Sequence, residues 1–375
     1  MIKRYQTETV SALMHKGKAI VLLGARQVGK TTLLQELLSN SPDTIWLNAD
    51  EPDIQALFEA PTSTKLAAYL GQYKTVVIDE AQRIADIGVK LKLITDNLKH
   101  LQLIATGSSA LELANKINEP LTGRKWELYL YPLSFGEMVD YHGLLQEKRL
   151  LTHRLLYGYY PEVVSNVGNE RKILRQLSDS YLYKDLLMWE GIKKPEKLIK
   201  LMQALALQIG SEVSYNEIGN MIGLDSQTVE KYIQLLEKSF VIFRLSSFSR
   251  NLRNELKKSK KIYFVDTGIR NALIANFAEP ALRNDIGGLW ENFIISEKRK
   301  QNHYSEKWCN SYFWRTNEQQ EIDYVEDSDG LLTATEFKWD GKAKNKFPTT
   351  FTKAYPDAKT QLITPDNFEQ FLDQD

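Results

Sequence analysis

The sequence has almost no cysteine, no net charge and no long apolar run. Cys309 is the only cysteine among 375 residues, which excludes an intramolecular disulfide and fits a reducing compartment. Lysine and arginine together number 48, as do aspartate and glutamate, so the overall charge does not indicate a nucleic-acid partner and any basic surface must be local. No stretch approaches the length of a membrane span. We therefore expect a cytoplasmic protein with no membrane partner and with about two or three domains.

The most informative stretch covers residues 18–38. Apolar residues 19–23 predict a buried strand, and leucines at helical spacing follow the glycine-containing octet at residues 24–31. The octet reads GARQVGKT and fits the phosphate-loop pattern G-x-x-x-x-G-K-[ST] at every fixed position. Strand, loop and helix in this order are the context in which the pattern binds phosphate. The predicted ATP-binding residues are Gly24, Ala25, Arg26, Gln27, Val28, Gly29, Lys30, Thr31 and Thr32.

Four residues have predicted roles in the chemistry of ATP. Lys30 is expected to contact the β and γ phosphates, and Thr31 to bind Mg2+ through its hydroxyl. A further apolar strand, residues 75–78, ends directly in Asp79 and Glu80. In a P-loop enzyme such an aspartate holds Mg2+, and the adjacent glutamate orients and deprotonates the attacking water. The pair therefore favours hydrolysis over a switch that only binds nucleotide.

Polar residues follow another predicted strand, residues 101–105. Thr106 or Ser108 at its tip can sense the γ phosphate, although serine and threonine at strand ends are also common turn formers. Further on, Arg124 follows a glycine and is a candidate finger that completes a neighbour's site and neutralises transition-state charge. A surface arginine in a loop is the alternative interpretation.

The segments GARQVGKTTLL, VVIDEAQ, TGSS and LTGRKWELYLYPLSFGE together resemble a prokaryotic AAA+-type P-loop ATPase family whose C-terminal half is a domain of unknown function. The resemblance covers most of residues 1–165. It implies an ATPase that forms homo-oligomers, with a ring as one form, and it places Arg124 at the family's G-R motif. The segment LLYGYYPEVV also resembles the family, except that Tyr159 replaces a glycine that is usual there.

The sequence in the middle of the chain predicts helices followed by a DNA-binding module. Residues 166–210 have helical periodicity and read as a linker or lid. Residues 214–222 and 226–238 read as two helices joined by a tight turn, with Ser226 as the N-cap of the second. That second helix has a polar face suited to a DNA groove, and packing or protein contact is the alternative. The DNA contacts predicted on it are Gln227, Thr228 and Lys231.

A predicted strand at residues 241–245 and a basic stretch at residues 250–261 complete a winged helix. The stretch contains one acidic residue, Glu255, and six basic residues, which are Arg250, Arg253, Lys257, Lys258, Lys260 and Lys261. Such a wing meets phosphates without reading sequence, and a solvated hairpin is the alternative. The DNA contacts predicted here are Arg250, Arg253, Lys257 and Lys258.

Residues 261–375 predict a last α/β domain. It begins with the segment KIYFVD, and a helix opens at residues 288–294. Three strands follow, at residues 312–315, 321–325 and 333–339. A peripheral strand and helix are expected in the tail.

Charged residues on these strands form a recognisable set. Asp323 lies in the second strand, while Glu336 and Lys338 are two residues apart in the third and so share a face. The set resembles the restriction-endonuclease-like PD-(D/E)xK nuclease fold, with Ile322 where a proline often stands. The resemblance implies that Glu291, Asp323 and Glu336 bind Mg2+ and that Lys338 helps to activate water. An inactive copy of the fold that holds DNA or protein is the alternative, as is an ordinary amphipathic strand.

The sequence as a whole predicts an α/β protein of four parts: an AAA+-type ATPase domain (1–165), a helical linker (166–210), a winged helix-turn-helix (211–260) and a restriction-endonuclease-like domain (261–375). We expect Mg2+-dependent ATP hydrolysis coupled to the binding, remodelling or processing of duplex or branched DNA. Two other functions stay open, namely a nucleotide-dependent switch whose C-terminal domains bind protein, and a DNA-binding regulator without hydrolysis. The balanced overall charge favours the switch, whereas the basic stretch favours DNA.

Overall fold

The computed structural model describes residues 2–108, 117, 120–182, 194–249, 259–342, 344 and 346–373. The chain forms two compact units. Unit 1 comprises Met1–Leu133 with Lys238–Phe240, and unit 2 comprises Ser134–Glu237 with Val241–Asp375. Across the described residues, none of the helices combines the length and the apolar character that crossing a membrane requires.

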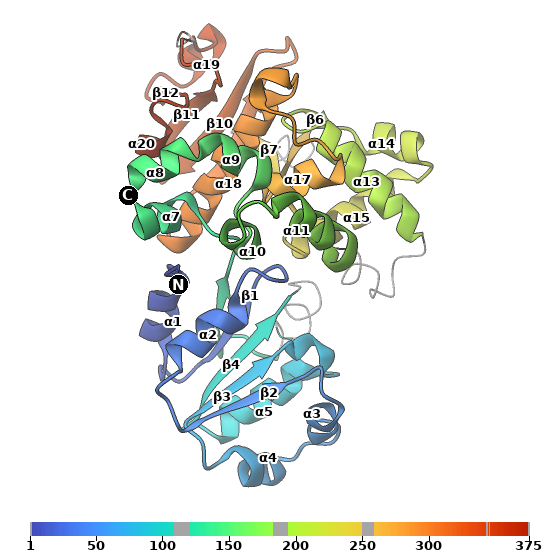
Figure 1. The fold of residues 1–375 in the computed structure, drawn as a ribbon, viewed down its shortest axis with the longest axis vertical. Helices are drawn as coiled ribbons and strands as arrows, with labels where there is room; N and C mark the ends of the chain where they lie inside the picture. The colour runs from blue at the N-terminus through green and yellow to red at the C-terminus, as the bar shows by residue number, and fades with distance from the viewer. Residues whose placement is uncertain are drawn as a thin grey trace. The chain divides into compact units, whose positions relative to one another are not determined.

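Unit 1 is a parallel sheet flanked by helices (Figure 1). Its strands are β1 (Ala19–Leu23), β2 (Thr44–Asn48), β3 (Thr75–Asp79), β4 (Gln102–Gly107) and β5 (Lys125–Tyr129). Its helices are α1 (Gln6–Leu13), α2 (Lys30–Leu37), α3 (Pro52–Leu57), α4 (Ser63–Leu70), the 3-10 turn η1 (Ala81–Arg83) and α5 (Ile87–Asn97). The predicted α/β class of this part of the chain is thereby confirmed, and the structure shows that its sheet is parallel.

The strand order in unit 1 is β2-β3-β4-β1-β5, and every neighbouring pair is parallel. Every residue of β1 and β4 is buried, because a parallel sheet covered on both faces needs nearly continuous apolar strands. The carboxyl ends of parallel strands meet at one edge of the sheet, where ligands of such folds bind. The loop after β1, the end of β3 and the end of β4 are therefore neighbours.

Unit 2 contains most of the helices and a second sheet. Its helices are α7 (Phe135–His142), α8 (Leu144–Arg149), α9 (Leu151–Tyr157), α10 (Pro161–Ser165), α11 (Glu170–Gln176), the π-helical η2 (Leu177–Leu182), α13 (Pro195–Leu207), α14 (Tyr215–Ile222), α15 (Ser226–Lys238), α17 (Thr267–Leu273), the 3-10 turn η3 (Pro280–Leu282), α18 (Ile286–Tyr304), α19 (Thr349–Ala354) and α20 (Phe368–Leu372). Its strands are β6 (Glu212–Val213), β7 (Ile242–Ser247), β8 (Lys260–Phe264), β9 (Asn310–Arg315), β10 (Glu321–Ser328), β11 (Leu331–Phe337) and β12 (Lys359–Ile363).

The sheet of unit 2 is mixed, with the order β12-β11-β10-β9-β7-β8-β6. Strands β9, β10 and β11 form an antiparallel meander, and β12 pairs parallel to β11. Trp314, Ile322 and Val325 pack with Phe351 of α19 in one apolar cluster. Helix α18 contacts β8 and β11, which brings its buried face to the strands that carry charged residues.

The sheet is continuous across residue 260, where the sequence analysis places a domain boundary. Strand β8 pairs antiparallel with both β7 and β6, while β7 also pairs parallel with β9. Strands of the predicted winged helix and of the predicted last domain thus belong to one sheet. Backbone pairing joins them, and the sequence patterns used to draw the boundary carry no information about it.

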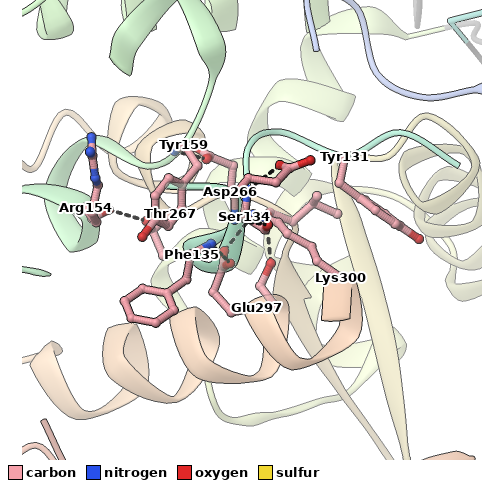
Figure 2. Close-up of polar contacts among 12 residues, drawn as sticks. Tyr131, Ser134, Phe135, Arg154, Tyr159, Asp266, Thr267, Glu297 and Lys300 are labelled. Carbon is pink, nitrogen blue, oxygen red and sulfur yellow. Dashed lines mark hydrogen bonds and ion pairs between the residues drawn. The ribbon is translucent and has the colours of Figure 1, made fainter. Parts of the chain in front are cut away.

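A buried polar cluster ties the start of unit 2 to its long helix α18 (Figure 2). Ser134 and Glu137 cap α7 reciprocally, since each side chain accepts a hydrogen bond from the backbone N–H of the other. The backbone N–H of Phe135 donates to Glu297 Oε2 at 2.7 Å, and Lys300 pairs with Glu297 at 2.6 Å. Burial raises the pKa of Glu297, and the Lys300 charge opposes that rise.

The segment with Tyr159 is held in the same region (Figure 2). Its backbone N–H donates to Asp266 Oδ2 at 2.7 Å, and burial raises the pKa of that carboxyl. Gly158 has a φ of +71°, and a Cβ there would lie 2.2 Å from Asp266 Oδ1. Gly158, the glycine of LLYGYYPEVV, is therefore required because Asp266 lies so close to it. Position 159, in contrast, accepts the large buried side chain of Tyr159.

Candidate ATPase site and two further predicted sites

The phosphate loop connects β1 to α2 in unit 1. Gly29 has a φ of +95°, and α2 begins at the next residue, Lys30. The Lys30 ammonium donates to the backbone oxygens of Gly24 and Ala25 at 2.8 and 2.9 Å. The lysine thus lies folded over its own loop, where an incoming phosphate would replace carbonyl oxygens as its acceptor.

Arg4 holds this loop by hydrogen bonds, and the sequence alone did not predict that role. Its guanidinium donates to the backbone oxygen of Val28 at 2.6 Å and to that of Tyr131 at 2.7 Å. A Cβ on Gly24 would lie 2.1 Å from the backbone oxygen of Leu130, so the same segment also packs directly on the loop. The signal is absent from the sequence because the arginine lies far along the chain from its partners.

Asp79 lies beside Thr31, as the phosphate-loop pattern predicts. The Thr31 hydroxyl donates to Asp79 Oδ2 at 2.9 Å, and the Thr106 hydroxyl donates to the other carboxylate oxygen. A threonine hydroxyl next to an aspartate at the start of α2 fits the protein ligands of a Mg2+ ion whose remaining ligands are phosphate oxygens and water. These two residues would hold the ion.

Thr106 is fully buried at the end of β4. Besides its bond to Asp79, its oxygen accepts a hydrogen bond from the Glu80 backbone N–H at 3.2 Å. It therefore orients the acidic pair directly. Sensing of the γ phosphate by Thr106 stays a prediction.

Glu80 is held by a residue that the sequence analysis did not single out. The Gln82 amide donates to Glu80 Oε2 and, at 3.1 Å, to the hydroxyl of Ser108. Glu80 itself has a left-handed backbone with a φ of +51°. Ser108 thus reaches the acidic pair through Gln82, and the segment VVIDEAQ contains the signal because Gln82 follows the pair by two residues.

Arg124 lies just before β5 on the surface of unit 1. Its Nε donates to Asp96 Oδ1 at 2.7 Å, and 43% of its side chain is exposed. The ion pair is partly solvated, so a competing anion can displace it at small cost. The geometry leaves the arginine accessible to another molecule, and its role as a finger stays a prediction.

The predicted helix-turn-helix corresponds to α14 and α15. Gln227 and Lys231 are exposed on α15, and Thr228 is half-buried. The N-cap prediction is wrong: Ser226 is the first helical residue, and Asp225 accepts bonds from the Thr228 N–H at 2.8 Å and from its hydroxyl at 2.7 Å. The carboxylate cap engages Thr228, so its hydroxyl is a weaker candidate for base contact. Four of the predicted DNA contacts lie outside the described residues, namely Arg250, Arg253, Lys257 and Lys258.

The residues of the predicted nuclease-like site come together in unit 2. Lys338, directly after β11, lies 2.7 Å from Glu336 Oε2 and 3.5 Å from Asp323 Oδ2. The Phe337 N–H also donates to Asp323 Oδ2 at 2.9 Å. Burial and the Asp323 charge raise the pKa of Glu291 to about 7 and also raise the pKa of Glu336. The four predicted residues thus share one electrostatic cluster.

Lys261 belongs to this cluster and not to a solvated wing. It is 1% exposed on β8, and its Nζ lies 3.0 Å from Glu291 Oε1 and 2.5 Å from Glu321 Oε1. Tyr263, two residues on and on the same face of β8, donates to Glu291 Oε1 at 2.5 Å. A run of cations in the sequence does not reveal which strand face each occupies, which is why Lys261 was counted with the wing.

The carboxylates of this cluster do not fit the predicted metal site. Within the described part of the chain, no group of three or more histidine, cysteine, aspartate or glutamate side chains is arranged to hold a metal ion. One oxygen each of Glu291, Asp323 and Glu336 instead contacts a lysine ammonium or another N–H or O–H donor. No reaction step through a metal at this position follows from the geometry.

Three family models match consecutive parts of the chain. Residues 16–139 match an AAA domain, and residues 148–280 and 286–374 match two domains of unknown function, DUF8612 and DUF4143. The chain therefore carries a P-loop ATPase domain of AAA type, and P-loop ATPases bind ATP and usually Mg2+.

Similar proteins are uncharacterized or share only the fold. An uncharacterized protein of Mycobacterium tuberculosis is 25% identical over 319 residues, which cover 84% of this chain and 68% of that protein. One of Haemophilus influenzae is 25% identical over 295 residues, covering 72% and 71%. The Walker-type ATPase of Pyrococcus abyssi aligns with a TM-score of 0.52 at 16% identity, over 73% of this chain and 96% of that one. At this identity the likeness concerns the fold alone.

Proposed function

We propose that this chain is a Mg2+-dependent ATPase that acts on DNA, with ATP bound and hydrolysed in unit 1 and DNA bound by unit 2. One observation carries the DNA part of the proposal. The elements α13, β6, α14, α15, β7 and β8 follow one another in the helix-strand-helix-helix-strand-strand order of a winged helix. Helix-turn-helix modules place their second helix in the major groove.

The pairing of the short strands supports this interpretation. Strand β6 pairs with β8, and β8 pairs with β7, so that the three strands form the antiparallel end of the sheet of unit 2. On α15, Val229, Ile233 and Leu236 are buried, whereas Gln227 and Lys231 face outward. The exposed face of α15 is polar and basic, as a DNA-contacting helix requires.

Four residues of unit 1 have proposed roles in ATP hydrolysis. The Lys30 ammonium exchanges the carbonyl oxygens of Gly24 and Ala25 for β and γ phosphate oxygens. Thr31 and Asp79 would hold a Mg2+ ion, which would neutralise charge on the phosphates. Glu80 orients the attacking water and accepts its proton.

Arg124 is the candidate for charge stabilisation across a subunit boundary. Its half-exposed guanidinium can exchange Asp96 for a phosphate in a neighbouring copy. This role requires a homo-oligomer, such as a ring. It predicts that Arg124→Ala protein regains hydrolysis when mixed with Lys30→Ala protein, because each copy then supplies what the other lacks.

The C-terminal part of unit 2 is proposed as a nuclease-like core that grips DNA. Its elements α18, β9, β10, β11, α19 and β12 run in the order helix, three strands, helix, strand. Asp323, Glu336 and Lys338 meet on two neighbouring strands of it, where the PD-(D/E)xK resemblance places them. A branched substrate rests on analogy with that fold alone.

The test is steady-state ATP hydrolysis by the full chain, alone and with single-stranded, duplex and four-way-junction DNA at fixed salt. We expect one DNA form to stimulate hydrolysis, and Lys30→Ala to abolish both basal and stimulated rates. Equal rates with and without every DNA form would instead favour the nucleotide-dependent switch that binds protein. DNA binding without any hydrolysis would favour the regulator.

A matched pair of variants tests the winged helix. Lys231→Ala removes a cation from the exposed face of α15, whereas Lys172→Ala removes an exposed cation from α11 in the same unit. If Lys231 contacts phosphate, its loss reduces the slope of log affinity against log salt by about 1, and the control leaves it unchanged. Equal slopes for both variants and the parent chain would count against α15 as part of the DNA interface.

A further inference from the structure

Lys261 has an unusual position for a basic residue next to a run of surface cations. Its ammonium is buried among carboxylates from two different elements, Glu291 of α18 and Glu321 of β10. It also lies 5.5 Å from the ring centroid of Phe313. A buried charge needs such partners, because an isolated ammonium in the interior is strongly unfavourable.

The carboxylates around Lys261 accept hydrogen bonds from further donors. Glu291 Oε1 accepts from Lys261 and from the Tyr263 hydroxyl. Glu321 pairs with Lys261 and, through its other oxygen, with Arg315 at 3.3 Å. Arg315 also reaches Glu212 of β6, at 3.4 Å. A chain of alternating charges thus runs through this end of the cluster.

The other end of the cluster is organised around Lys338. Its ammonium pairs with Glu336 and, at longer distance, with Asp323. Four acids, namely Glu291, Glu321, Asp323 and Glu336, therefore face two lysines and one arginine within unit 2. The negative charge that would attract a divalent ion is largely neutralised by residues of the chain itself.

We propose that the Lys261 ammonium is the resident cation of this carboxylate cluster, and that the cluster therefore takes no divalent metal and does not cleave DNA. This inference deepens the function proposed for the nuclease-like core. A Mg2+ ion needs near-octahedral oxygen ligands at about 2.1 Å, and Oε1 of Glu291 already accepts two donors. Repulsion by the adjacent ammonium opposes the ion further, because a buried pair of cations is screened little.

The proposal predicts that removal of the ammonium creates a metal site. Lys261→Met keeps an unbranched side chain that is one atom shorter, and it leaves Glu291 and Glu321 without their shared cation. A divalent ion can then replace the lost charge. In the double variant Lys261→Met/Glu291→Gln one ligand is lost again, and the ion is no longer held.

The experiment measures Mn2+ binding to the full chain in the absence of nucleotide, so that the P-loop lacks the phosphate oxygens its metal needs. Thermal unfolding is followed with and without Mn2+. We expect no Mn2+-dependent shift for the parent chain, a rise of about 3 °C or more for Lys261→Met, and no rise for the double variant.

Measurements on the parent chain test the proposal even if Lys261→Met fails to fold. Parent and Asp323→Asn proteins are compared for Mn2+ bound per chain and for nicking of supercoiled DNA. Equal Mn2+ binding and no nicking in either supports the proposal. Mn2+ binding or nicking that Asp323→Asn abolishes overturns it. Stimulation of ATP hydrolysis by DNA is recorded separately with Mg2+, so that a failed cluster proposal stays distinct from a failed DNA proposal.

Discussion

Gln82 gives the sharpest test of how unit 1 performs hydrolysis. Its side-chain amide bonds the carboxylate of Glu80 and the hydroxyl of Ser108, which makes it a positioning residue for the proposed general base. A hydrogen bond to a charged group contributes about 1.5–3 kcal/mol. If Gln82→Ala loses that amount in the transition state, kcat falls about 10- to 100-fold. Gln82 is not part of the phosphate loop, so the KM for ATP should change less than about threefold.

The assay is steady-state ATP hydrolysis with nucleotide affinity measured in parallel. Gln102→Ala is the matched control, because Gln102 also donates its amide within unit 1, to the Lys18 backbone oxygen, but from the opposite end of β4 to Thr106. Ser108→Ala removes only the second anchor and should reduce kcat less than Gln82→Ala does. An unchanged kcat in Gln82→Ala, or a rise in KM alone, would refute the positioning role.

Three further predictions concern substitutions at buried positions. Gly24→Ala puts a Cβ 2.1 Å from a backbone oxygen, so nucleotide titration should detect no ATP binding. Gly158→Ala, whose Cβ would meet Asp266 at 2.2 Å, should destabilise unit 2 by about 2–4 kcal/mol in denaturant unfolding, whereas Gly168→Ala, with a φ of +91° but open space, should cost about 1 kcal/mol. Glu147→Gln should cost about 3 kcal/mol at neutral pH. Burial alone would raise the pKa of Glu147, but Arg154, whose buried guanidinium donates to the two Glu147 carboxylate oxygens at 2.8 and 3.1 Å, lowers that pKa overall. The cost should therefore shrink as pH falls below about 4.5, and a constant cost down to about pH 3 would contradict this.

The sequence predicts the phosphate loop well because the signal is local. The strand, the glycines and the first turn of α2 are contiguous, and β3 presents Asp79 where a continuous apolar run ends. Arg4 is different. Arg4 reaches backbone oxygens at separations of 24 and 127 residues, and no spacing rule connects such positions. Backbone acceptors carry no residue-type signature, so only the fold reveals the contact.

The nuclease-like residues could be placed together from the sequence, but their partners could not. Asp323 and Glu336 fall on neighbouring strands of one meander, so their proximity follows from the alternation of strand faces. Whether their charge is met by a metal or by lysine depends on β8, which joins the same sheet only through pairing with β7. That pairing is long-range, and the predicted boundary at residue 260 hid it.

Strand β8 explains why the chain looks divisible in sequence and is not divided there in structure. It pairs with β6 and β7, the other strands of the proposed winged helix, and it carries Lys261 and Tyr263, which contact the acidic cluster. In a winged helix with its own boundary, β8 would still lie between β6 and β7, and the free edge would be that of β7. Here β9 pairs with that edge of β7, so that the strands flanking the proposed DNA-contacting helix and those carrying the acids belong to one sheet. A rigid sheet of this kind suits a module that holds a nucleic acid in a fixed register, with the lysine-neutralised cluster as part of its core.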